Sequence, residues 1–233
     1  CGERRLTYAE VDERANRLAH ALAAQGIGPG DHVAVYLYNG TEYLETMPAA
    51  FKLRAVPVNV NYRYVEDELR YLLDDSDARA VVFHTEFAPK LSAIRARLPR
   101  LTGFVAVADS AAREVQRDLG ALGALDYEEA LASAPAARDF GPRSPDDLYI
   151  LYTGGTTGNR KGVMWRAEDI FFAALGGGSL DGDPITAPDQ LVGNLDTKRR
   201  CLPACPFMHG TAHWLALNTL YGGGTVIISP DRR

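Results

Sequence analysis

Segments with helical periodicity alternate with short apolar runs along most of this 233-residue chain. The first helix is expected to begin at Thr7 and Glu10, which have capping-box spacing, and to end at Gly26. Strands that alternate with helices of this length form a largely parallel sheet with helices on both faces, so the sequence predicts the α/β class. Thr41 is the expected cap of the second helix. Helices are expected at residues 7–26, 41–53, 65–73, 87–98, within 122–132, and at 167–174 and 212–220, and strands at 32–38, 56–60, 80–84, 104–108, 148–151, 201–204 and 225–229.

The composition excludes several classes of protein. Hydrophobic residues make up 46% and charged residues 24%, which is ordinary for a globular domain. The formal net charge of −5 argues against a nonspecific nucleic-acid binder, because such domains are usually basic. No apolar run approaches the roughly 20 residues of a membrane-spanning helix. Three cysteines do not suggest a disulfide framework, so a cytoplasmic location is expected.

Residues 152–163, with the sequence YTGGTTGNRKGV, have the composition of a phosphate-binding loop. The loop follows the apolar run at 148–151. Glycines allow backbone N–H groups to approach an anion closely, threonine hydroxyls add donors, and a lysine adds positive charge. The residues expected to bind the oxyanions of a polyphosphate are Thr153, Gly154, Gly155, Thr156, Thr157, Gly158 and Lys161.

The common nucleotide-binding motifs do not explain this loop. A Walker A loop requires Ser or Thr after its lysine, and Gly162 follows Lys161. The chain also lacks the G-x-G-x-x-G sequence of a dinucleotide-binding fold. A plain hairpin between two strands remains the alternative interpretation.

The loop resembles the signature of the adenylate-forming (AMP-binding) superfamily, [YF]-T-[SG]-G-[TS]-T-G-x-P-K-G, except that Arg160 replaces the usual proline. Residues 6–19 resemble the opening L-T-Y-x-E-L segment of that family. Residues 51–64 resemble its second core segment, with Arg54 where glycine is usual. The stretch from Pro206 to Gly222 and beyond resembles the segment downstream of the loop, so the resemblance runs in family order from about Leu6 to the end.

The resemblance implies that residues 1–233 are a partial N-terminal AMP-binding domain, without the C-terminal part and the small lid domain. It also implies ATP-dependent activation of a carboxylic acid to an acyl-adenylate and then to acyl-CoA. The substrates would be a small-molecule carboxylate, ATP and coenzyme A, with Mg²⁺ held mostly by residues outside this fragment. The family's later motifs, including Y-G-x-T-E and a C-terminal lysine, are missing, so the fragment alone is expected to be inactive. The resemblance leaves the oligomeric state open.

Within the superfamily, residues 154–158 and 162–166 are similar to those of fatty-acyl-CoA synthetases and relatives that act on bulky apolar acids. Aryl-CoA ligases and amino-acid-activating domains remain open. The resemblance assigns catalytic roles to Lys161 and His209, the latter beside the acyl pocket. The residues expected to line that pocket are Phe207, Met208, His209 and Trp214.

Two readings outside catalysis compete with this one. The first is a noncatalytic nucleotide- or acyl-binding module. The second is a zinc-stabilised domain, because Cys201, Cys205, His209 and His213 are each four residues apart. Prolines 203 and 206 would interrupt a helix that aligned these four, so no metal site is predicted.

The two arginines that depart from the family pattern lead to separate expectations. Arg160 could grip phosphate or point into solvent, and the solvent position is favoured. Arg54 follows a helix, and if that helix end requires a positive φ, a non-glycine residue there costs roughly 1 kcal/mol.

Overall fold

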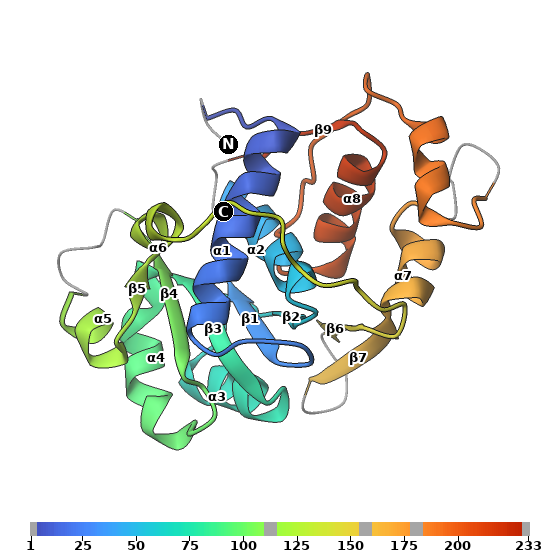
Figure 1. Ribbon diagram of the computed structural model, residues 1–233. Coiled ribbons are helices and arrows are strands. Elements are labelled where there is room, and N and C mark those ends of the chain that lie inside the picture. The colour runs from blue at the N-terminus through green and yellow to red at the C-terminus, as the bar shows by residue number, and fades with distance from the viewer. Residues whose placement is uncertain (1–3, 110–115, 154–159, 178–183, 230–233) are drawn as a thin grey trace.

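The computed structural model describes residues 4–109, 116–153, 160–177 and 184–229. Within these residues a seven-stranded sheet has the strand order β5-β4-β3-β1-β2-β6-β7 (Figure 1). All its pairings are parallel except that of β6 with β7, which is antiparallel. The predicted α/β class is therefore confirmed. The strands are β1 (His32–Tyr36), β2 (Val56–Asn59), β3 (Ala78–His84), β4 (Gly103–Val107), β5 (Leu125–Asp126), β6 (Leu148–Thr153) and β7 (Lys161–Arg166), and a small second sheet pairs β8 (Arg200–Cys201) with β9 (Thr225–Val226).

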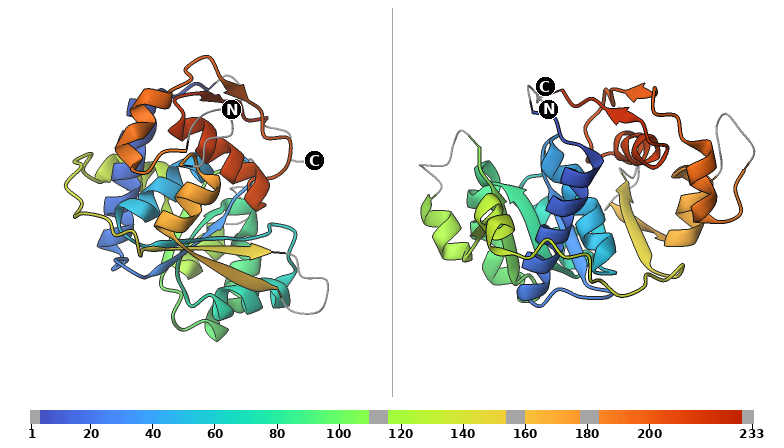
Figure 2. Two further views of the ribbon diagram at one scale, coloured as in Figure 1. Left: turned by 90° about the vertical axis from the view of Figure 1, so that its right-hand side faces the viewer. Right: turned by 45° about the horizontal axis from the view of Figure 1, so that its top comes forward.

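Helices cover both faces of the large sheet, and Figure 2 shows that α8 lies on the same side as α1 and α2. One face packs against α1 (Tyr8–Ala24), α2 (Thr41–Lys52), α6 (Tyr127–Ser133), α7 (Ala167–Ala174) and α8 (Gly210–Tyr221). The other packs against α3 (Glu66–Asp75), α4 (Ala88–Ile94) and the end of α5 (Gln116–Leu122). Short 3-10 helices occupy Thr85–Phe87, Arg95–Arg97 and Pro188–Asn194.

The central strands are apolar along their whole length because they lie between these two layers. In β1, Val33 and Val35 belong to one core, whereas Ala34 and Tyr36 belong to the other. Successive strand residues point to opposite faces, so a strand buried on both sides reads as a continuous apolar run. This is why periodicity identified β1 to β4 directly.

Local signals at helix ends were accurate in α1 and wrong in α2. Thr7 and Glu10 form the capping box, with the Thr7 backbone N–H donating to Glu10 Oε2 at 2.6 Å. Gly26, just past the end of that helix, has φ +83°. Thr41 is not the cap of α2; Gly40 holds that position without a side-chain hydrogen bond, and Thr41 is the first helical residue.

Other expected boundaries also changed. The strands expected at 201–204 and 225–229 shorten to the two-residue strands β8 and β9. Helix α5 was not predicted, and the helix expected at 87–98 is α4 followed by a 3-10 turn. Among the described residues, no helix is long and apolar enough to cross a bilayer.

Arg54 follows α2 and has a positive φ of 57°. The helix end therefore has the conformation in which a non-glycine residue is strained. The Ala55 N–H donates to the Ala50 carbonyl at 3.0 Å, and the Arg54 N–H donates to the Phe51 carbonyl at 3.1 Å. These two hydrogen bonds form a Schellman motif, the helix end at which glycine is usual. The Arg54 side chain forms an ion pair with Asp147 that offsets this backbone strain. Its Nη2 donates to Asp147 Oδ1 at 2.8 Å and its Nε donates to the same oxygen at 3.0 Å. The pair connects the end of α2 to the residue before β6.

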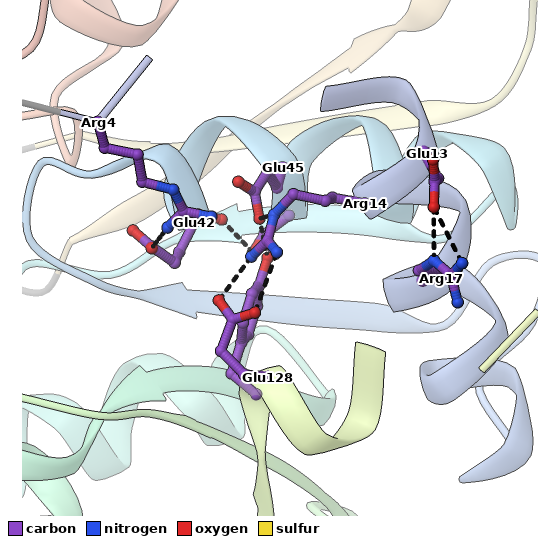
Figure 3. Close-up of polar contacts among 9 residues, drawn as sticks. Arg4, Glu13, Arg14, Arg17, Glu42, Glu45 and Glu128 are labelled. Carbon is purple, nitrogen blue, oxygen red and sulfur yellow. Dashed lines mark hydrogen bonds and ion pairs between the residues drawn. The ribbon is translucent and has the colours of Figure 1, made fainter. Parts of the chain in front are cut away.

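A buried charge cluster connects three helices on the first face (Figure 3). Glu45 on α2 is fully buried and lies 3.0 Å from Arg14 Nε of α1. The Tyr127 hydroxyl of α6 donates to Glu45 Oε2 at 2.6 Å, and Arg14 also pairs with Glu128 at 2.7 Å. The hydrogen bond from Arg14 lowers the pKa of Glu128. Each buried charge is thus paired, as burial requires.

Candidate active site

The predicted phosphate loop connects the two strands of a hairpin. β6 and β7 pair from Leu148 opposite Arg166 to Thr153 opposite Lys161. Thr153 and Lys161 are therefore cross-strand partners at the end of the hairpin next to the loop, and both are exposed. The predicted phosphate-binding residues between them, Gly154, Gly155, Thr156, Thr157 and Gly158, lie outside the described residues. The two interpretations of this stretch, a hairpin between strands and a phosphate-binding loop, are therefore compatible, because the loop connects the strands of a hairpin.

Gly162 allows this hairpin to close. A Cβ at Gly162 would lie 2.9 Å from Cγ2 of Ile150 and 2.9 Å from a ring carbon of Tyr152 on the facing strand. Any other residue would force the side chains of Ile150 or Tyr152 to shift, because real Cβ atoms essentially never approach so closely. The glycine after the loop lysine therefore has a packing role.

Arg160 does not point freely into solvent, so the expectation favoured from the sequence is wrong. Its Nη1 lies 2.9 Å from Glu68 Oε1, and its guanidinium carbon lies 4.2 Å from the centroid of the Tyr64 ring. The hydrogen bond from Arg160 is the largest cause of the lowered pKa of Glu68. The Tyr71 hydroxyl also donates to the Arg160 carbonyl at 3.3 Å.

Both strands that flank the loop form side-chain hydrogen bonds to one face of α3. On the β6 side, the Tyr152 hydroxyl donates to Asp75 Oδ2 at 2.7 Å. On the β7 side, Arg160 meets Glu68 and Tyr71. Residues 68, 71 and 75 are three and four apart, a spacing that places them on one side of a helix. Burial, followed by the hydrogen bond to Asp75, raises the pKa of Tyr152.

The segment before α8 carries the other predicted site residues. Phe207 and Met208 are buried, and the Phe207 ring centroid lies 5.4 Å from that of Tyr43. His209 is exposed and is the N-cap of α8, although its side chain forms no cap bond. Trp214, one turn into α8, is partly buried. The structure therefore gathers the predicted acyl-pocket residues around the start of one helix.

A hydrogen-bonded relay that the sequence did not indicate lies beneath this segment. His213 is fully buried, and its Nδ1 lies 2.6 Å from the Phe207 carbonyl, which can only accept. Nδ1 therefore carries the proton, and Nε2 accepts from the Tyr149 hydroxyl. That hydroxyl in turn accepts from Trp214 Nε1 at 2.8 Å. Burial lowers the pKa of His213 to about 4, so the ring is neutral at pH 7.

The relay removes a ligand from the zinc alternative, because both ring nitrogens of His213 are already bonded. Across the described part of the chain, no three His, Cys, Asp or Glu side chains gather in a way that could hold a metal ion. Cys201 and Cys205 are free thiols there.

Two asparagines at the carboxyl edge of the sheet were also missed. Asn39 follows β1, and its Oδ1 accepts from the Phe207 N–H at 2.6 Å. Asn59 ends β2 and donates to the Met208 carbonyl at 2.7 Å. The carboxyl edge of an open parallel sheet is where such folds bind ligands. A position directly after an apolar strand was the available signal for both residues.

Comparison with known proteins agrees with this arrangement. A 3-oxocholest-4-en-26-oate–CoA ligase from Rhodococcus rhodochrous is 44% identical over 232 residues, which are 98% of this chain and 41% of that protein. The medium-chain acyl-CoA ligase Mig from Mycobacterium avium is 43% identical over 97% of this chain and 43% of its own length. The chain therefore spans less than half the length of these two relatives.

A solved structure and a family model extend the comparison. The N-terminal domain of FACL13 from Mycobacterium tuberculosis superposes with a TM-score of 0.74 at 28% identity, over 99% of this chain and 52% of that one. The family model described as AMP-binding enzyme matches residues 1–233. Because this match covers the whole chain, the chain belongs to the AMP-binding enzyme family.

Proposed function

We propose that this chain is part of the large domain of an ATP-dependent acyl-CoA synthetase. The observation that carries the proposal is the hairpin whose loop end presents Thr153 opposite Lys161, beside the segment that ends in His209. Family membership and the two ligase relatives support it. Because the chain covers 41% and 43% of those relatives, we propose that it works within a longer polypeptide that also supplies the lid domain.

The proposed reaction has two steps. A carboxylate oxygen attacks the α-phosphorus of ATP, and pyrophosphate leaves. The thiol of coenzyme A then attacks the acyl carbon of the mixed anhydride, and AMP leaves. The first step needs a bound polyanion, a carboxylate in line with the α-phosphorus, and stabilisation of charge on the leaving pyrophosphate.

The described residues fit the polyphosphate part of this task. The hydroxyl of Thr153 is a donor, and no carboxylate of the described residues pairs with Lys161, so its ammonium group can meet an anion. The backbone N–H groups of Gly154, Gly155 and Gly158, with the hydroxyls of Thr156 and Thr157, would complete the cradle. Mg²⁺ would be held mainly by phosphate oxygens and by residues elsewhere in the longer polypeptide, as is usual for this ion.

We propose a fatty or other bulky apolar acid as the substrate. The names of the two relatives, a steroid-acid ligase and a medium-chain acyl ligase, support this class. The aromatic groups beside His209 also support it, since Trp214 and Trp165 meet edge to face with ring centroids 6.4 Å apart. Phe207 packs into the core against Tyr43, so Trp214 has the stronger claim to line the pocket.

Carboxylate-dependent ATP–pyrophosphate exchange tests the proposal. The complete polypeptide would be assayed with medium-chain, long-chain, steroid and aromatic carboxylates. Exchange that requires an apolar acid supports the ligase. Exchange without any carboxylate requirement contradicts it, and ATP binding without exchange identifies a noncatalytic binding module instead.

A further inference from the structure

We infer that Asn59 is a positioning residue that couples the stem of the phosphate loop to the segment that carries His209. The inference rests on the proposed function for its catalytic consequence, although its structural part can be tested alone. Asn59 lies at the end of β2 and is 7% exposed.

The amide of Asn59 bonds two segments at once. Its Oδ1 accepts from the Tyr152 N–H at 2.8 Å, and its Nδ2 donates to the Tyr152 carbonyl at 3.0 Å. The same Nδ2 donates to the Met208 carbonyl at 2.7 Å. The two carbonyls can only accept and the N–H can only donate, so the orientation of the amide follows from its partners.

The side chain replaces a missing part of the sheet. β2 and β6 pair at a single position, Val58 opposite Ile150. Tyr152 lies two residues further along β6, and there its N–H and carbonyl bond the side chain of Asn59 instead of a strand backbone. The strands can therefore separate at the carboxyl edge without unpaired buried groups. Met208 enters at this point of separation.

The residues that Asn59 holds directly precede two predicted site residues. Tyr152 is followed by Thr153 at the loop stem, and Met208 is followed by His209. A shift of about 1 Å between reacting groups can cost roughly 10²-fold in rate. One amide thus sets the distance between the phosphate side and the acyl side of the site.

The other anchors of this segment form no hydrogen bond to Tyr152, the β6 residue nearest the loop stem that Asn59 bonds. Asn39 accepts from the Phe207 N–H, and His213 donates to the Phe207 carbonyl. His213 reaches β6 at the Tyr149 hydroxyl, three residues before Tyr152. Loss of Asn39 should therefore disturb the acyl side, whereas loss of Asn59 should disturb both sides.

The structural test is hydrogen–deuterium exchange on Asn59→Leu, with Asn16→Leu as the matched control. Asn16 is also buried, and it donates to the Ala136 carbonyl at 3.0 Å, in a different part of the molecule. We expect Asn59→Leu to raise exchange about tenfold at the Tyr152 amide and in residues 206–209. We expect Asn16→Leu to leave both regions unchanged. Equal effects of the two variants, or an effect on only one region, would overturn the inference.

The kinetic test uses Asn59→Asp, which also serves if Asn59→Leu does not fold. An ionised aspartate places an oxygen against two carbonyl oxygens, whereas the neutral acid can accept from Tyr152 and donate to one of the carbonyls. We expect pyrophosphate exchange by Asn59→Asp to recover relative to wild type as the pH falls, and KM to rise for both ATP and the carboxylate. A pH-independent ratio, or a change in one KM only, contradicts coupling. Absence of exchange in the wild type would reject the proposed function and leave the deuterium result to decide the inference.

Discussion

The guanidinium group of Arg160 lies on the ring of Tyr64, with its central carbon 4.2 Å from the ring centroid. The loop signature usually has proline at this position, and proline limits motion by fixing φ. Arginine reaches a similar end by contact, because its ion pair with Glu68 and its stack on Tyr64 hold the β7 stem against α3. A residue that departs from the pattern thus keeps the stem in place by another physical route.

Replacing Arg160 by alanine should weaken ATP binding more than it weakens the fold. The stem would lose its stack and ion pair, each worth about 0.5–1 kcal/mol at a half-exposed site. We expect KM for ATP to rise several-fold in Arg160→Ala. Arg160→Pro should stay close to wild type, and Glu68→Gln should fall between the two because it spares the stack. Wild-type KM in Arg160→Ala would show that the contact does not position the loop.

Loss of the Lys161 ammonium group should impair adenylation without unfolding the protein. The side chain is exposed and its strand pairing with Thr153 uses only the backbone, so Lys161→Ala should unfold at nearly the wild-type temperature. Removal of one group that stabilises developing negative charge typically costs about 10²–10³ in rate. ATP–pyrophosphate exchange and thermal unfolding measure the two effects. Full exchange activity in the variant would exclude this role for the lysine.

His213 should make stability depend on pH in the acidic range. Burial lowers its folded pKa to about 4, below the ordinary value of 6.5, so the unfolded chain binds the proton first as the pH falls. Stability from this group is therefore complete above about pH 6.5 and is lost toward pH 4, by roughly 3 kcal/mol in total.

The variant His213→Gln isolates this effect, because glutamine does not titrate. We expect the free energy of unfolding of wild type to fall more steeply than that of the variant between pH 6.5 and 4. Denaturant titrations at each pH give the comparison. Carboxylates with lowered pKa values, such as Glu128, contribute to both proteins alike and cancel in the difference. Parallel curves would mean that the ring is not held neutral.

The positive φ at Arg54 predicts an unusual order of stability. Arg54→Ala keeps the strained backbone and loses the fork to Asp147, whereas Arg54→Gly loses the fork but removes the strain. We expect Arg54→Gly to be more stable than Arg54→Ala by about 1 kcal/mol, although glycine is usually the more destabilising residue. Urea unfolding of the two variants measures the difference, and the reverse order would contradict the conformation described here.

The parts of the site that sequence predicted are those that depend on local chemistry. Residues 152–163 carry their own donors and follow an apolar strand, so the hairpin stems and the exposed Lys161 could be inferred without knowledge of the fold. The capping box of Thr7 and Glu10 is equally local. Arg54 could be assigned to a left-handed position because the family pattern has glycine there.

The remaining features depend on contacts between distant segments. The partners of Arg160, which are Glu68 on α3 and Tyr64 just before that helix, lie about ninety residues away in the sequence. No local pattern therefore indicated that the side chain packs against them instead of pointing into solvent. From the sequence, His213 was a candidate zinc ligand four residues from His209. Its hydrogen bond to Tyr149 depends on the fold, because the two residues are far apart in the sequence. Asn59 read as a strand end, and its double role requires both β6 and the segment before α8.

The buried pair of Arg14 and Glu45 has a consequence for trimming the chain. Removal of α1 would take away Arg14, the cation paired with Glu45, together with the helix whose apolar face packs in the same core as α2. The carboxylate is 0% exposed while α1 is in place, so removal of the helix would also open this part of the core to water. We therefore expect α1 to belong to the cooperative folding unit, so a shortened version of this domain should keep the helix that carries Arg14.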